Sequence, residues 1–381
     1  MARSNREQVG FIEEATWGTT PATPTGQLLN VTSNSLAQQN QTTNSAFIRS
    51  DTNIAGNIRT GTETSGDIGI ELQYGGYDDL LEGALRNEWG TATAVTATDI
   101  SFTNATRVIN SVAGAFGDLV AGQWIRVSGS DSNDGYYPVV TATDANNIVV
   151  GGADLTDESA SASITIKSQV LSNGVIEKSY TFERGFLDIS QYMVMTGCRV
   201  GAMSLSFGLQ AIAGGSISLL AKSSTASGAT GWNSTAAAAT TQSMNTVDSI
   251  KGVYVDGVAA TVDLAGFDFS ITTNAEQLNK IGQLAATDIV TNSIGVTGTI
   301  TEYFEDLTFL NKAIGFTEFR LTIIVGDEDG NDYAFDFPSC RIGQGAPDNG
   351  GINQTLTTPY QFEATLSGTL GYTVAVSRLV A

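Results

Sequence analysis

Apolar and polar residues alternate with a period of two along much of the chain, which predicts β-strands. Segment 67–74 shows the pattern with four apolar side chains on one strand face, Ile68, Ile70, Leu72 and Tyr74. The same alternation recurs in segments 266–272, 294–300, 321–325 and 333–337. The last two flank a turn rich in Gly and Asp, so they predict a hairpin. Small hydroxyl residues and glycine fill many outward positions, which suits sheets that pack closely or face other subunits.

Helical patterns are few and short. Residues 77–86 begin with acidic side chains, end on Arg86 and carry one apolar stripe, as expected for a helix packed on a core; the stripe is Leu80, Leu81, Ala84 and Leu85. Apolar spacing predicts a second helix over 301–314 and a short third one over 276–284. With so few helices we predict a mainly β fold, a β-sandwich or barrel with one or two flanking α-helices.

Two polar segments interrupt these patterns. Residues 32–65 are rich in Thr, Asn, Gln and Ser and weakly periodic, so we expect a long loop. A loop of about 30 residues is uncommon in a compact domain and indicates a binding segment or disorder. Residues 221–245 form a low-complexity Ala/Ser/Thr/Gly run, which predicts an exposed, mobile loop.

Short strands and turn clusters between residues 90 and 167 predict a small all-β domain inserted into the main one. We therefore expect a discontinuous main domain, 1–90 and 168–381, and an inserted domain, 91–167. The aromatic residues Trp124, Tyr136 and Tyr137 of the insertion would pack in its core. A stacking platform for carbohydrate or single-stranded nucleic acid is the alternative, although no basic groove accompanies these rings.

Composition excludes several classes of function. The 381 residues include 18 Lys+Arg, 39 Asp+Glu and no His, for a formal net charge of −21. Without histidine there is no Ser-His-Asp machinery and no His-ligated metal. The acidity opposes binding to nucleic acid or anionic lipid. No apolar run approaches the roughly 18 residues of a membrane helix, and residues 1–14 lack the apolar core of a signal peptide, so we expect a soluble cytoplasmic product.

Candidate chemical sites have structural explanations. The acidic run 327–332 has Asp332 where a calcium loop needs glycine, so it is interpreted as a turn. Paired carboxylates at 78–79 and 305–306 lie in predicted helices without a recognisable cleft. We therefore predict no catalytic residue, no metal and no cofactor. Cys198 and Cys340 are interpreted as a reduced, buried pair, with a disulfide as the alternative.

Several segments carry a family resemblance through their order and spacing: 14–21 (EATWGTTP), 65–82 (SGDIGIELQYGGYDDLLE), 273–282, 296–306 (VTGTITEYFED), 350–354 (GGINQ) and 362–364. Together they resemble the major tail tube proteins of long-tailed, siphovirus-like bacteriophages, a family related in fold to the type VI secretion tube protein. The resemblance covers roughly residues 8–90 and 170–375. It implies a structural virion protein of the phage tail, made in the bacterial host cytoplasm, with no enzymatic activity.

The resemblance also implies partners. Homo-hexameric rings would stack into a hollow tube, meet the tape measure, tail tip and terminator proteins, and let double-stranded DNA pass during ejection, without membrane binding by this chain. The 32–65 loop would reach a neighbouring ring through apolar anchors and charges, namely Phe47, Ile48, Arg49, Asp51, Ile54 and Arg59. A merely floppy loop is the alternative. Six chains carry 6 × −21 = −126 charges, and an acidic lumen would repel DNA, but the sequence does not identify the residues that line it.

Two other classes of function compete with this one. The first is a surface or adhesin-like carbohydrate-binding β protein that uses the 91–167 insertion. The second is a hydrolase with paired carboxylates, which the missing histidine and nucleophile motif disfavour.

Overall fold

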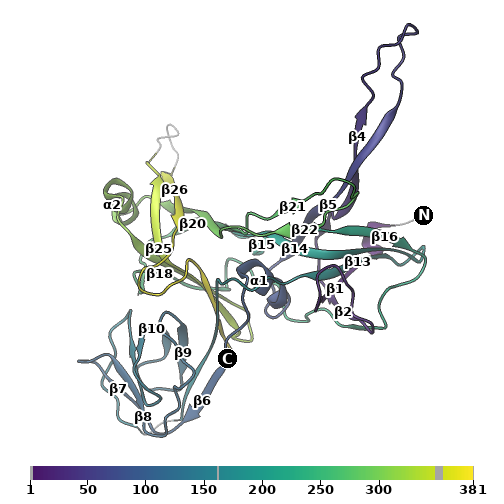
Figure 1. Cartoon of the computed structure of the whole chain (residues 1–381). Coiled ribbons are helices and arrows are strands. Elements are labelled where there is room, and N and C mark those ends of the chain that lie inside the picture. Colours follow the sequence, from purple (N-terminus) through teal and green to yellow (C-terminus); the bar gives the residue numbers. More distant parts are fainter. Residues whose placement is uncertain (1–2, 161–162, 348–354, 381) are drawn as a thin grey trace.

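The computed structural model describes residues 3–160, 163–347 and 355–380, and it is mainly β with two short helices, as the alternation predicts (Figure 1). Hydrogen bonds connect 25 of the strands in these ranges into one network. One large apolar core lies beneath the network, and a smaller core lies in the insertion. The 350–354 motif lies outside the described residues.

An antiparallel central sheet has the order β5–β15–β14–β20–β23–β26, with β3 and β4 both paired to the outer side of β5. The strands are β3 (Ser33–Asn34), β4 (Ala37–Asn44), β5 (Asn57–Glu71), β14 (Gln191–Gly208), β15 (Gly214–Ala221), β20 (Leu264–Thr272), β23 (Gly295–Tyr303) and β26 (Thr357–Ala364). Their period-two alternation sends one set of side chains, such as Ile68, Ile217 and Phe269, into the large core.

The sheet continues beyond β26 through the predicted hairpin. β25 (Asp332–Gln344) pairs with β24 (Phe319–Gly326) along its length, which confirms the hairpin over 321–325 and 333–337. β24 then pairs with β18 (Ile250–Val255), which pairs with the short β19 (Val258–Ala259). The other side of β25 is divided between β26 and β27 (Ala375–Leu379).

The first half of β14 belongs to a second sheet. It pairs with β13 (Tyr180–Phe186) on one side and with β16 (Ser223–Ser227) on the other. β13 pairs with β1 (Glu7–Glu13), β1 with β2 (Thr25–Leu29), and β2 lies parallel to β17 (Ser234–Ala236). A single 3₁₀ turn, η1 (Ser4–Arg6), precedes β1. The run 221–245 is therefore not simply a loop, because backbone pairing holds β16 and β17, and Trp232 is only 9% exposed.

Of the three predicted helices, one is confirmed, one is half right and one is wrong. α1 (Asp78–Leu85) lies where the apolar stripe predicts it. α2 (Thr308–Gly315) begins only after β23, since residues 301–303 alternate with period two and pair with β26. The helix over 276–284 is wrong, because β21 (Glu276–Leu278) forms a hairpin with β22 (Asp288–Val290).

The insertion has its own strands and core. They are β6 (Thr93–Ala97), β7 (Ile100–Thr103), β8 (Val108–Ser111), β9 (Trp124–Ser128), β10 (Gly135–Ala142), β11 (Asn147–Val150) and β12 (Ile164–Ser172). The first half of β12 pairs with β6 and β9, whereas its second half pairs with β27. One uninterrupted strand thus carries hydrogen bonding from the insertion into the rest of the chain.

Candidate assembly surfaces

The polar segment 32–65 forms a projecting hairpin, which we name the arm (residues 37–61). The prediction of a structureless loop is wrong, because β4 and the first part of β5 pair from Ala37↔Ser65 to Asn44↔Asn57. Cross-strand hydrogen bonds satisfy the backbone of the paired residues, but an exposed two-stranded ribbon gains little stability of its own. It rises away from the body of the molecule (Figure 1).

Large apolar side chains are exposed at the tip of the arm. Phe47 is 78% exposed, Ile48 102% and Ile54 69%, and Ile58 below them is 59% exposed. Three of these are the anchors expected for a neighbouring ring. Exposed apolar side chains gathered at the end of a projecting element favour a contact surface over a solvated loop.

The charged residues of the arm lie in two places. Arg49 donates from Nε to Oδ1 of Asp51 at 2.8 Å, and its Nη2 donates to the other carboxylate oxygen. This pairing lowers the pKa of Asp51 below its usual range. Both side chains are nearly half exposed, so the pair contributes little stability. Arg59 lies lower, opposite Thr42, with Nη1 donating to Oδ1 of Asn40 at 3.4 Å.

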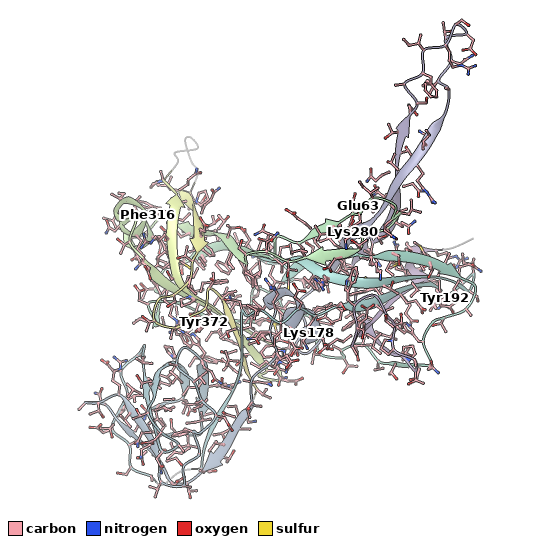
Figure 2. All side chains as sticks on the ribbon, in the orientation of Figure 1. Glu63, Lys178, Tyr192, Lys280, Phe316 and Tyr372 are labelled. Carbon is pink, nitrogen blue, oxygen red and sulfur yellow. The ribbon has the colours of Figure 1, made fainter. Side chains whose placement is uncertain are left out.

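The base of the arm is held by the segment around β21 and β22. The backbone N–H of Thr62 donates to the carbonyl of Leu284 at 2.9 Å. Gln277 donates from Nε2 to the carbonyls of Thr64 and Ala221, both at 3.0 Å. Figure 2 shows Glu63 and Lys280 at this base. The base is thus fixed to the body while the tip stands free.

One face of the central sheet carries small polar side chains, and we name it the polar face. Its members are outward neighbours across the ladders, and none is buried: Asp67, Glu71, Ala202, Ser204, Ser206, Ser216, Ser218, Asp268, Ser270, Thr272, Thr297, Thr299, Gln361 and Glu363. One row crosses five strands as Ser216, Ser204, Ser270, Thr297 and Glu363. These side chains are hydroxyls and carboxylates with one amide and one methyl group. Leu220, two residues after Ser218 on β15, and Arg341 of β25, which pairs with Glu363, border the face.

Acidic side chains lie at intervals on the polar face. Asp268 lies beside Thr299 on the neighbouring strand, and partial burial raises its pKa. Asp67 accepts a hydrogen bond from Ser218, and Glu71 accepts one from Ser243 at 2.9 Å. The 14 members include four carboxylates and no Lys or Arg, so the face has a negative potential.

Helix α1 lies on the opposite, core side of the central sheet. Leu80, Leu81, Ala84 and Leu85 are each at most 1% exposed and share a core with inward residues of the central strands. Asp78, at the first turn, accepts hydrogen bonds from Tyr333 and pairs with Arg378, and its burial raises its pKa. The helix covers the back of the sheet and leaves the polar face open.

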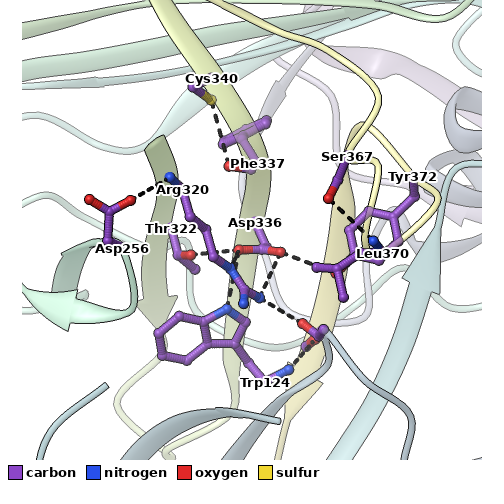
Figure 3. Close-up of polar contacts among 12 residues, drawn as sticks. Trp124, Asp256, Arg320, Thr322, Asp336, Phe337, Cys340, Ser367, Leu370 and Tyr372 are labelled. Carbon is purple, nitrogen blue, oxygen red and sulfur yellow. Dashed lines mark hydrogen bonds and ion pairs between the residues drawn. The ribbon is translucent and has the colours of Figure 1, made fainter. Parts of the chain in front are cut away.

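Trp124 joins the insertion to the main sheet rather than filling the core of the insertion. It is fully buried, packs with Ile324, Ala334 and Leu379, and donates from Nε1 to Asp336 at 3.3 Å (Figure 3). Its predicted role in the core of the insertion is therefore wrong. The three rings of the carbohydrate-binding alternative form no open platform. Trp124 is fully buried and Tyr137 is 5% exposed, whereas the partly buried Tyr136 packs against the Trp124 cluster and donates from its hydroxyl to Asp332 at 2.7 Å.

Asp336 is the centre of a buried polar cluster that no sequence pattern indicates. Arg320 donates to both its carboxylate oxygens at 2.7 and 2.9 Å, Thr322 donates at 2.6 Å and Tyr372 at 3.3 Å. Arg320 also donates to the carbonyl of Gly122 in the insertion at 2.7 Å. These groups come from distant segments, so only the folded chain brings them together.

The described residues give little support for a disulfide, a metal site or a membrane helix. Cys198 and Cys340 are free and buried, so the disulfide alternative is wrong, and burial raises the pKa of both thiols. Within residues 3–160, 163–347 and 355–380, no three Cys, Asp or Glu side chains gather in a way that could hold a metal ion. In those same ranges, no helix has the length and apolar character needed to cross a membrane.

An open polar face, an arm with an apolar tip and an insertion joined through β12 and Trp124 are features that suit a structural protein that associates with other copies. The chain matches the phage tail tube protein family over residues 4–364 and belongs to that family. It is accordingly a structural, non-enzymatic component of the phage tail tube in the virion. No curated protein matches the chain.

Proposed function

We propose that the chain forms hexameric rings that stack into the tube of a long-tailed, siphovirus-like phage, and that the polar face lines a channel for double-stranded DNA. The observation that carries the proposal is this face, which is open, spans six strands and is negative in a protein of the tail tube family. On this proposal the subunit is also related in fold to the type VI secretion tube protein, and tape measure, tail tip and terminator proteins meet the ends of the tube.

The charge of the polar face suits a conduit. Four carboxylates in each chain give 4 × 6 = 24 around a ring of six. They repel phosphates that approach within about one Debye length, roughly 8 Å at physiological salt. Phosphate contacts from Lys or Arg would instead bind DNA at every ring, with affinity falling steeply as salt rises. Short hydroxyl side chains keep the wall smooth, so DNA slides rather than binds.

Electron microscopy of the purified chain tests assembly. We expect tubes of uniform width whose cross-sections have sixfold symmetry. A variant in which Asn-Gly replaces residues 42–60 closes the hairpin between the paired Gln41 and Gly61. It should keep its circular dichroism spectrum but no longer stack. Only monomers of the unmodified chain would refute the proposal, and normal tubes from the short-arm variant would refute the role of the arm.

Charge reversal tests the channel. Phage carrying Asp268→Lys and Glu363→Lys should assemble tails but eject DNA more slowly at low salt, with recovery as salt is raised. The matched control is Glu328→Lys with Asp329→Lys, which changes net charge equally in the exposed β24–β25 turn. Equal ejection rates in the two variants would show that the polar face does not line the channel.

A further inference from the structure

An apolar groove opens at the end of the central sheet opposite the arm. It is lined by Leu209, Ile250, Val253, Val262, Leu264 and Ile323 and encloses about 270 Å³. Apolar side chains at its rim are exposed, with Leu209 at 59% and the nearby Val247 at 67%. This volume lies at the lower limit of the roughly 300–1,000 Å³ typical of ligand pockets, so the position and charge of the groove, rather than its size, point to its occupant.

The strand register fixes the positions of the groove and the arm. The arm leaves the sheet where Thr64 of β5 pairs with Ala221. At the other end of β5, Glu71 pairs with Gly214, and next to that end Gly208 of β14 pairs with Gly266 of β20. Leu209 and Leu264 adjoin this second pair. In Figure 1 the arm accordingly stands at one end of the central sheet, with β18 beyond the other.

We propose that the groove receives the arm tip of a second copy of this chain, with Phe47, Ile48 and Ile54 as the inserted side chains. The inference rests on the proposed stacking of rings and names its acceptor surface. A donor at one end and an acceptor at the other make a heterologous contact, which repeats head to tail and builds an open stack. A self-complementary contact of two arms would instead stop at a pair of copies.

Charge supports the same occupant. The arm contains Arg49, Arg59 and Asp51, so its net charge is 2 − 1 = +1 in a chain of −21, which leaves −22 for the rest. Segments 246–253 and 260–267, which contribute lining residues, carry the exposed Asp248 and Asp263 and one base, Lys251, whose Nζ donates to the backbone carbonyl of Asp248 at 3.1 Å, so their net charge is 1 − 2 = −1. The arm is therefore the part of the molecule that an acidic rim attracts while its apolar tip fills the groove.

Disulfide trapping in assembled tubes tests the pairing. Full-length chains with Ile48→Cys are mixed with full-length chains with Leu209→Cys, and the mixture is assembled and oxidised. The disulfide-joined peptides are then identified by mass spectrometry. The native thiols do not interfere, because Cys198 and Cys340 are fully buried. The matched control pairs Ile48→Cys with Val112→Cys, a substitution at a 76% exposed position of the insertion.

We expect the 48–209 disulfide to form at least about tenfold faster than the 48–112 disulfide, since docking raises the effective concentration of the two thiols. Tubes that form without this preference would overturn the groove as acceptor and leave the proposed function standing. Arm tips joined mainly to each other would overturn it in the same way. If the unmodified chain forms no tubes, both the proposed function and this inference fail.

Discussion

The carboxylate of Asp336 gives the sharpest test of how the insertion is held. The side chain is 1% exposed and accepts hydrogen bonds from Arg320, Thr322, Trp124 and Tyr372. The substitution Asp336→Asn keeps the size of the side chain but removes its charge. It also points an amide N–H₂ at groups that are themselves donors.

The expected loss in the free energy of unfolding follows from the charge and the donors that the substitution leaves buried without a partner. Removing one partner of a buried ion pair costs about 3–5 kcal/mol, because the other charge stays buried without compensation. A buried donor left unsatisfied costs about 1–3 kcal/mol. The two costs are not additive, because the ion pair and the hydrogen bonds share the same carboxylate as acceptor. We therefore expect a loss of about 3–5 kcal/mol, a large part of the roughly 5–15 kcal/mol that stabilises a typical domain.

Urea unfolding measures this loss, with tryptophan fluorescence as the signal because Trp124 lies in the cluster. The matched control is Glu318→Gln, which breaks the exposed ion pair between Glu318 and Arg341 (3.3 Å) and should cost less than about 1 kcal/mol. A loss below about 1 kcal/mol for Asp336→Asn at an unchanged urea dependence would refute the reasoning. It would show that the cluster is hydrated or easily rearranged.

Two further substitutions test the central sheet by urea unfolding. Gly298→Ala places a methyl group 2.6 Å from the ring of Phe362 and closer still to a backbone carbonyl, so the free energy of unfolding should fall by about 1–3 kcal/mol. In the control Gly343→Ala the new methyl group has no atom within 4 Å, so the free energy of unfolding should not fall. Equal losses in the two variants would contradict the packing argument. Burial raises the pKa of Glu302 from its usual 4.5 to about 7. Between pH 4.5 and 7 the folded state thus holds a proton that the unfolded state releases, so the free energy of unfolding should fall as the pH rises through this range. Glu302→Gln should abolish that fall. The same pH profile in the variant and the unmodified chain would contradict this assignment to Glu302.

Strand positions and one helix could be predicted because they depend on local periodicity. The stripe from Leu80 to Leu85 marks the buried side of α1. The alternation on both sides of the 326–331 turn marks one buried face of the hairpin, whereas the structure also buries the other face, with Ile324 and Ala334 packed against Trp124. The helix expected over 301–314 failed where period two and helical spacing overlap. Tyr303 satisfies both patterns, and its pairing with Thr357, a residue 54 positions away, decides for the strand.

The arm and the polar face could be predicted only in part. The apolar residues Phe47, Ile48 and Ile54 stand out within a polar segment, so a contact role follows from the sequence. The strand pairing that forms the arm does not follow from the sequence, because a two-stranded ribbon exposed on both sides has no hydrophobic alternation. Ser204 and Thr297 become parts of one surface only through strand register, which depends on pairings between distant segments.

The charge of the chain acts differently on its two candidate surfaces. On the polar face, carboxylates lie among short hydroxyl side chains, and on the proposed function their repulsion of phosphate would favour passage of DNA over binding. In the proposed stack of acidic rings, the same repulsion would oppose association, so the contact between rings would have to draw on apolar burial, which depends little on charge. The arm meets that need, since its tip is apolar and its net charge is +1. On the proposed function, the conduit could be strongly acidic because the residues proposed to hold its rings together are not.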